Sequence, residues 1–187
     1  MFGTNPLTIA FPTASKPIVI DMATSAIASF KVRLAALRGE SIPEGVAIDS
    51  EGRVTTDPSK VYAILPFGGY KGYAISLAVE ILAGILAGKI LGTKILWHGS
   101  TQGGFFAAAL DPTTFIDPKT YLDMINELVK EIKSSPPAKG FTEVLLPGEP
   151  EDRTYQQRHT QGIPLDEEIW NTIAKIARTK GIEIPTP

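Results

Sequence analysis

The chain has 187 residues, of which 43% are hydrophobic and 20% charged, and these proportions exclude disordered and collagen-like chains. It contains no cysteine, which excludes disulfides, thiolate metal sites and cysteine nucleophiles, and its two histidines are too few for a multi-histidine metal site. The formal net charge of −2 lacks the basic excess of a nucleic-acid-binding protein. We therefore expect an enzyme or binding protein with no metal ion and no nucleic-acid partner.

Neither the N-terminus nor the longest apolar stretch indicates a membrane protein. The first residues lack the basic and apolar regions of a targeting signal, so we expect a cytoplasmic location. The apolar stretch 73–91 approaches the length of a membrane span, but it contains Glu80, Lys89 and two glycines, and its flanks have no positive bias. The stretch is therefore interpreted as a buried helix, with a helix predicted at 72–88.

The first elements along the chain are a hairpin and a helix. Residues 7–11 and 17–20 are short β-prone runs separated by a polar turn at 13–16. A helix is predicted at 24–38, because its apolar residues recur at helical spacing and Gly39 follows where a left-handed C-cap would lie. The residues expected on its apolar face are Ile27, Phe30, Leu34 and Leu37.

The later segments continue to alternate between strand-like and helix-like patterns. The predicted strands are 105–110 and 142–146, and the predicted helices are 118–133, 151–161 and 166–181. The last helix is expected to bury Ile169, Trp170, Ile173 and Ile176. This alternation predicts an α/β fold with a mixed sheet flanked by helices. We expect an α/β portion at 1–118 and a mainly helical portion at 119–187.

A glycine-rich loop leads into the apolar helix and could bind an anion. Gly68, Gly69 and Gly72 allow backbone to approach a ligand closely. The N–H groups and the positive dipole end of the following helix face this loop, and Lys71 adds a cation. The other interpretation is a tight entry turn with a surface lysine, since the loop matches neither a P-loop nor the G-x-G-x-x-G motif.

Three further places have polar residues next to predicted element ends. Asp21 follows a strand and could accept hydrogen bonds from ribose hydroxyls, or it could cap the next helix together with Thr24 or Ser25. His98 could be a general base, although a lone histidine in a polar loop is more often a surface residue. The residues of the segment 147–150 predict a rigid turn, and by themselves they indicate no function.

In their order along the chain, several short motifs resemble the malate/L-lactate dehydrogenase family of the second type, whose relatives include L-sulfolactate, ureidoglycolate and cyclic-imine-reducing enzymes. The matching motifs are Gly3-Thr4-Asn5-Pro6, Asp21-Met22-Ala23-Thr24-Ser25, Ile42-Pro43-Glu44-Gly45, Thr55-Thr56-Asp57-Pro58, Leu65-Pro66 with Gly69-Tyr70-Lys71-Gly72-Tyr73, Ser135-Pro136-Pro137 and Pro147-Gly148-Glu149-Pro150-Glu151.

This resemblance implies a non-Rossmann nicotinamide-binding fold with a helical C-terminal portion. It implies NAD or NADP as cofactor, a small 2-hydroxy or 2-oxo acid as substrate, and a homodimer or higher oligomer. The portion 1–118 would then be the cofactor-binding part. By the same resemblance, the cofactor-binding residues are Asp21, Met22, Ala23, Lys71, Gly148, Glu149 and Pro150.

The resemblance also implies that a substantial part of the family's fold is not represented in these residues. Family chains are longer, and their N-terminal half supplies the catalytic histidine and a Ser-His-x-x-Arg segment for the substrate carboxylate. We therefore expect a truncated C-terminal half that contains no catalytic residue and is inactive alone. The alternative is a non-catalytic nucleotide-binding or assembly subunit that needs a separate N-terminal chain.

Overall fold

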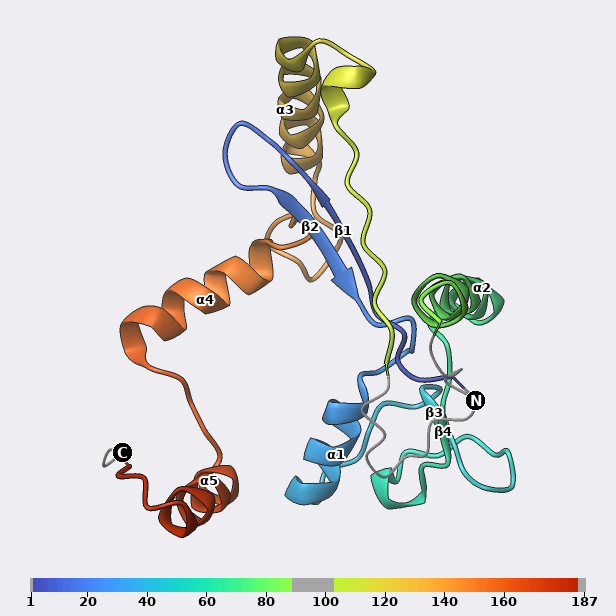
Figure 1. Cartoon of the computed structure of the whole chain (residues 1–187), viewed down its shortest axis with the longest axis vertical. Coiled ribbons are helices and arrows are strands. Elements are labelled where there is room, and N and C mark those ends of the chain that lie inside the picture. The colour runs from blue at the N-terminus through green and yellow to red at the C-terminus, as the bar shows by residue number, and fades with distance from the viewer. Residues whose placement is uncertain (1, 89–102, 185–187) are drawn as a thin grey trace. The chain divides into compact units, whose positions relative to one another are not determined.

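The computed structural model describes residues 2–88 and 103–184 (Figure 1). The chain divides into two compact units, Met1–Pro147 and Gly148–Pro187. The first unit contains strands and helices, which agrees with the predicted α/β class, whereas the described elements of the second unit are helices. The predicted mixed sheet is wrong for the described residues, which form two separate two-stranded antiparallel sheets.

The predicted hairpin is confirmed. Strand β1 (Leu7–Phe11) pairs antiparallel with β2 (Ile18–Met22) over five residues. The connecting turn is closed by the Thr13 hydroxyl, which donates a hydrogen bond to the carbonyl of Lys16 at 2.7 Å. Because β2 ends two residues later than predicted, Asp21 and Met22 are part of the strand and do not belong to a loop after it.

A small core forms between helix α1 (Ser29–Arg38) and a second antiparallel pair, β3 (Ala47–Ile48) and β4 (Ala63–Ile64). A short 3-10 turn, η1 (Pro58–Lys60), connects the two strands. The buried core residues are Val32, Ala35, Ile42 and Ala47, and the partly buried ones are Ile27, Val46, Val61 and Ile64.

Helix α1 differs from its prediction in both its start and its buried face. It begins at Ser29, since residues 24–26 pair instead with the segment before α2. Phe30 and Leu37, predicted to face the core, are 65% and 62% exposed, and the smaller Val32 and Ala35 are buried in their place. Gly39 follows with φ 65°, which confirms the predicted left-handed C-cap.

The apolar stretch forms α2 (Tyr70–Val79) and continues as a π-helical segment, η2 (Glu80–Ile85). The residues buried along it are Gly72, Ser76, Glu80 and Gly84, one in every four. The prediction of a buried helix is therefore wrong for its apolar side, because small and polar residues form the buried side. The large apolar residues exposed along it are Tyr70, Tyr73, Leu77, Ile81, Leu82, Ile85 and Leu86.

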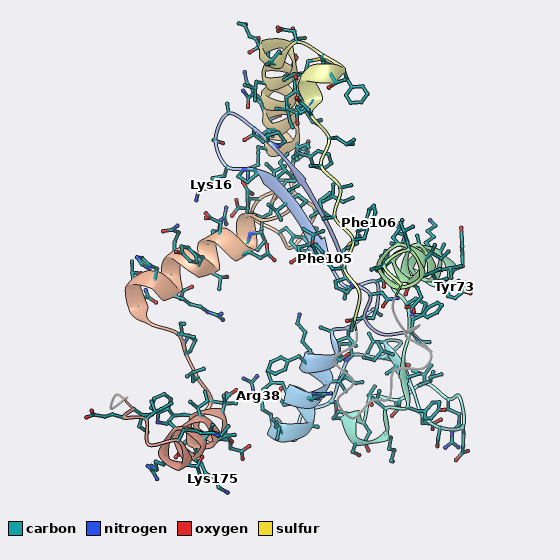
Figure 2. The ribbon with its side chains drawn as sticks, viewed as in Figure 1. Lys16, Arg38, Tyr73, Phe105, Phe106 and Lys175 are labelled. Carbon is teal, nitrogen blue, oxygen red and sulfur yellow. The ribbon has the colours of Figure 1, made fainter. Side chains whose placement is uncertain are left out.

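Two predicted strands are wrong. The segments 105–110 and 142–146 are not strands, since neither is paired in a ladder in the described part of the chain. Phe105 and Phe106 project from the first of these segments (Figure 2), where they are 84% and 44% exposed. The carbonyl of Val144, in the second, accepts a hydrogen bond from the ammonium of Lys133 at 2.8 Å.

The remaining helices begin and end close to the positions predicted from the sequence. A 3-10 turn, η4 (Pro112–Thr114), precedes α3 (Pro118–Ser134) in the first unit, and α4 (Glu149–Gln161) and α5 (Glu167–Thr179) form the second. Among the residues predicted to be buried in the last helix, Ile173 and Ile176 are exposed, and the buried residues are Ala174 and Ala177. In the described ranges we find no helix with the length and apolar character that crossing a membrane requires.

Candidate functional site

The first candidate segment is the end of β2. Asp21 lies opposite Thr8 in the hairpin, and its Oδ1 accepts a hydrogen bond from the Thr8 hydroxyl at 2.7 Å. Asp21 and Met22 are exposed and Ala23 is half-buried. The strand therefore presents an exposed carboxylate near its end, and this group can accept further hydrogen bonds from the hydroxyls of a ligand.

The second candidate segment is the N-terminus of α2. Gly68 and Gly69 have φ values of 55° and 65°, and a Cβ atom at either would meet no atom within 4 Å. Within residues 2–88 and 103–184, the N–H groups of Tyr70 and Lys71 have no acceptor, and the exposed Lys71 ammonium has no acidic partner. Two free N–H groups, the helix dipole and a cation fit a phosphate or another anion.

A close approach of backbone fixes the geometry of this helix start. The N–H of Gly72 donates to the carbonyl of Phe67 at 3.0 Å. A Cβ atom at Gly72 would lie 2.2 Å from that same oxygen, a distance that no side chain can tolerate. Gly72 is therefore required by the turn that places Lys71 at the helix end.

The structure brings the first two candidate segments together. The N–H of Phe67 donates to the carbonyl of Thr24 at 3.1 Å, and the N–H of Ala26 donates to the carbonyl of Leu65 at 2.7 Å. Thr24 does not cap α1, which begins five residues later at Ser29, so the capping interpretation of this segment is wrong. The segments that carry Asp21–Ala23 and Lys71 are thus hydrogen-bonded neighbours within the first unit.

The third candidate segment, Gly148–Pro150, starts the second unit. Gly148 has φ 94° as the N-cap of α4, and the first turn of this helix contains Glu149, Glu151 and Asp152. Carboxylates at a helix N-terminus are favoured by its dipole, and they accept hydrogen bonds from hydroxyl or amide groups more readily than they bind phosphate. The residue before this turn, Pro147, accepts a hydrogen bond from the Val19 N–H of β2 at 3.2 Å.

An open depression of about 660 Å³ lies along α4 and includes one candidate residue, Pro150. The rings of Tyr155 and His159 stack beside it, with centroids 5.9 Å apart. His98, the other histidine considered as a base, lies outside the described residues. No cluster of side chains suited to a metal ion occurs among the residues with assigned structure.

A buried polar cluster beneath α2 was not predicted from the sequence. The amide of Asn5 donates to the Ser76 hydroxyl and to Glu80 Oε2, at 3.2 and 3.1 Å. A signal was present, because Glu80 is a lone carboxylate in an apolar helical stretch and Asn5 belongs to the Gly-Thr-Asn-Pro motif. A charged residue in such a stretch requires a polar partner when it is buried.

Comparisons with known proteins identify the family of the chain. Residues 1–174 match the family model described as malate/L-lactate dehydrogenase. The L-sulfolactate dehydrogenase of Methanothermobacter thermautotrophicus is 41% identical over 190 aligned positions, covering 98% of this chain and 54% of the relative. The malate dehydrogenase of Pyrococcus horikoshii is 36% identical, with the same shares of the two chains covered.

Solved structures show the same relationship. The sulfolactate dehydrogenase of Methanocaldococcus jannaschii is similar with a TM-score of 0.77 and 36% identity, over 97% of this chain and 54% of that one. These matched proteins all have the names of dehydrogenases. The chain belongs to the malate/L-lactate dehydrogenase family, and it spans about half the length of the relatives it matches.

Proposed function

We propose that these residues are the cofactor-holding part of an NAD(P)-dependent oxidoreductase that transfers hydride between nicotinamide and a small 2-hydroxy acid. Malate is the first substrate to test, because several relatives are named malate dehydrogenases. The observation that carries the proposal is the helix start at Lys71. An exposed ammonium and two free N–H groups lie at this helix start, and the preceding residue Phe67 donates a backbone hydrogen bond to Thr24, next to the end of β2.

Each candidate residue has a role suited to its chemistry. Lys71 and the start of α2 would bind the cofactor's phosphates, and Asp21 with the backbone of Met22 and Ala23 would accept and donate hydrogen bonds at a ribose. The turn Gly148–Pro150, with its carboxylate, would contact hydroxyl or amide groups. The bound nicotinamide supplies the redox chemistry, while these residues bind and orient it.

Either NAD or NADP is compatible with this arrangement. The carboxylate of Asp21 would repel a 2′-phosphate if the adenosine ribose is the one bound at the end of β2. The cation at Lys71 would favour phosphate at whichever position of the dinucleotide faces it. Comparison of NADH with NADPH is therefore part of the experiment below.

The proposal also concerns whether the 187-residue polypeptide can catalyse the reaction alone. By the family resemblance, the catalytic histidine and the substrate-binding arginine would belong to an N-terminal half, and the residues present span 54% of the L-sulfolactate dehydrogenase they match. We expect a polypeptide of these 187 residues to bind the cofactor without oxidising malate. The matched dehydrogenases favour this proposal over a non-catalytic assembly subunit.

The proposal is tested by replacing Lys71 with alanine. Loss of charge-assisted hydrogen bonds to phosphate is expected to raise the Kd for NADH or NADPH by about tenfold or more, measured by titration calorimetry. Lys130→Ala, which removes an exposed lysine from α3, is the matched control and leaves Kd unchanged. An unchanged Kd in Lys71→Ala would remove this residue from the site.

A further inference from the structure

Thr24 connects three segments of the first unit and is the largest side chain in the described residues that is completely buried, with 1% of its surface exposed. Its N–H and its hydroxyl both donate to the carbonyl of Thr4, at 2.9 and 3.0 Å, and the hydroxyl also reaches the carbonyl of Asn5 at 3.1 Å. Its carbonyl accepts the N–H of Phe67. All the polar atoms of this residue therefore take part in hydrogen bonds.

Asn5 continues these interactions into α2. Its φ of 38° is the one positive value among non-glycine residues in the described part of the chain, and this conformation directs the side chain towards the helix. The amide nitrogen of Asn5 donates to the carbonyl and hydroxyl of Ser76 and to Glu80 Oε2, over 3.1 to 3.2 Å. Ser76 and Glu80 are 5% and 8% exposed, so these bonds form away from solvent.

We propose that Thr24 and Asn5 are positioning residues, which hold the N-terminus of α2 and its Lys71 at a fixed place relative to the end of β2. Neither residue needs to contact the cofactor. This inference rests on the proposed function, in that the ligand contacted by Asp21–Ala23 and by Lys71 is one dinucleotide. It adds a role for the Gly-Thr-Asn-Pro segment and for the carboxylate of Glu80, which the proposed function leaves unused.

The physical reason is preorganisation. A ligand that is bound at two places gains the full interaction at both only if the protein already holds them at the matching separation. In the described residues a single backbone bridge, Ser25 with Pro66, joins the end of β2 to the segment before α2, and no longer ladder fixes their separation. The hydrogen bonds of Thr24 and Asn5 supply that constraint, and their burial protects them from competition with water.

The test uses Thr24→Val, which keeps the shape of the side chain and the backbone hydrogen bonds but removes the hydroxyl. Thr24→Ser retains the hydroxyl and is the conservative rescue variant. Thr172→Val is the matched control, because it removes an exposed hydroxyl that donates to the carbonyl of Glu168 at 2.9 Å on α5. Amide hydrogen exchange without nucleotide reports on the interactions themselves. We expect faster exchange at Phe67 and Gly72 in Thr24→Val, and wild-type exchange in Thr24→Ser and Thr172→Val.

The effect on nucleotide binding is tested by a double-mutant cycle, in which the Kd for NADH or NADPH is measured for Thr24→Val, Lys71→Ala and the double variant. If Thr24 acts by placing Lys71, Thr24→Val raises Kd about tenfold in the wild-type background and less than about twofold in the Lys71→Ala background. A general loss of folding would weaken binding equally in both backgrounds. Thr24→Ser is expected to restore the wild-type Kd.

The outcomes separate this inference from the proposed function. If the wild-type chain binds neither nucleotide, the proposed function fails and the positioning role fails with it. If it binds nucleotide but Thr24→Val leaves Kd unchanged, or raises it equally in both Lys71 backgrounds, the inference alone is overturned. Unchanged exchange at Phe67 in Thr24→Val would also overturn it.

Discussion

Gly72 shows how a single residue limits what the start of α2 can be. The backbone of Phe67 passes so close to this position that a methyl group there would lie 2.2 Å from the carbonyl oxygen and 2.9 Å from the nitrogen. Since both atoms belong to the backbone, neither can move away as a flexible side chain would. The turn and the helix would have to separate.

We therefore predict that Gly72→Ala lowers the free energy of unfolding by at least about 1–3 kcal/mol, the usual cost of overpacking. Urea unfolding provides the measurement. Gly103→Ala is the control, because its added Cβ would meet nothing within 4 Å and its φ is not positive. Equal stability of the two variants would contradict the close approach.

At the residue scale, the sequence indicates the candidate site more clearly than the contacts that support it. Three glycines beside Lys71 indicate an anion site without any knowledge of the fold, because their conformational freedom and the charge are local properties. The interactions of Thr24 with Thr4 and of Asn5 with Glu80 join residues about 20 and 75 positions apart. No local pattern specifies such pairs, so Thr24 was interpreted as a helix cap.

At the scale of elements, the N-terminus of α3 gives a prediction with a pH dependence. Asp117 Oδ2 accepts hydrogen bonds from the N–H and the hydroxyl of Thr120, at 2.9 and 3.1 Å. These bonds lower the pKa of the Asp117 carboxyl. A carboxyl with a lowered pKa in the folded state stabilises the protein fully above its unfolded-state pKa, and this contribution is lost as the pH falls through the folded-state value.

Asp117→Asn should therefore be less stable than the wild type at neutral pH, and the difference should disappear in acid. The expected reason is that asparagine still caps the helix but lacks the charge that interacts with the helix dipole. Unfolding midpoints measured from neutral to strongly acidic pH test this. Glu127→Gln, in the middle of α3, controls for loss of a charge on the same helix, and a pH-independent difference for Asp117→Asn would refute the prediction.

Helices and strands that are specified by a local sequence pattern were predicted well. Those that depend on pairing with a distant segment were not. The hairpin has a turn between two β-prone runs, and α3 has an apolar stripe and an Asp-Pro start, so both are confirmed. Residues 105–110 have strand-like composition, but a strand also needs a paired neighbour, and none is present in the described ranges. Composition alone cannot supply that information.

The prediction of which side of helix α2 is buried was wrong for a different reason. It is apolar around most of its circumference, so periodicity could not indicate which side would be buried. The buried side is the one with Gly72, Ser76 and Glu80, since small and polar residues allow the Asn5 segment to approach closely.

For the molecule as a whole, the exposed apolar side of α2 and η2 leads to a prediction about assembly. Contiguous apolar residues on a surface usually mark an interaction site. We propose a dimer or higher oligomer, with a mass by light scattering of at least about twice the 20.1 kDa of one chain. Ile81→Glu places a charge at a residue that is 45% exposed on this side and is expected to dissociate the oligomer. Lys130→Glu on α3 is the control, and a wild-type monomer would contradict the proposal.

The central claim is that the end of β2 and the start of α2 hold a nicotinamide dinucleotide. Backbone NMR shifts recorded while NADH or NADPH is added to the 187-residue chain test this most directly. We predict saturable shifts concentrated at Met22, Ala23 and Lys71, with the core around Ala47 unchanged. Absence of saturable shifts, or shifts confined to regions that exclude both segments, would contradict the account.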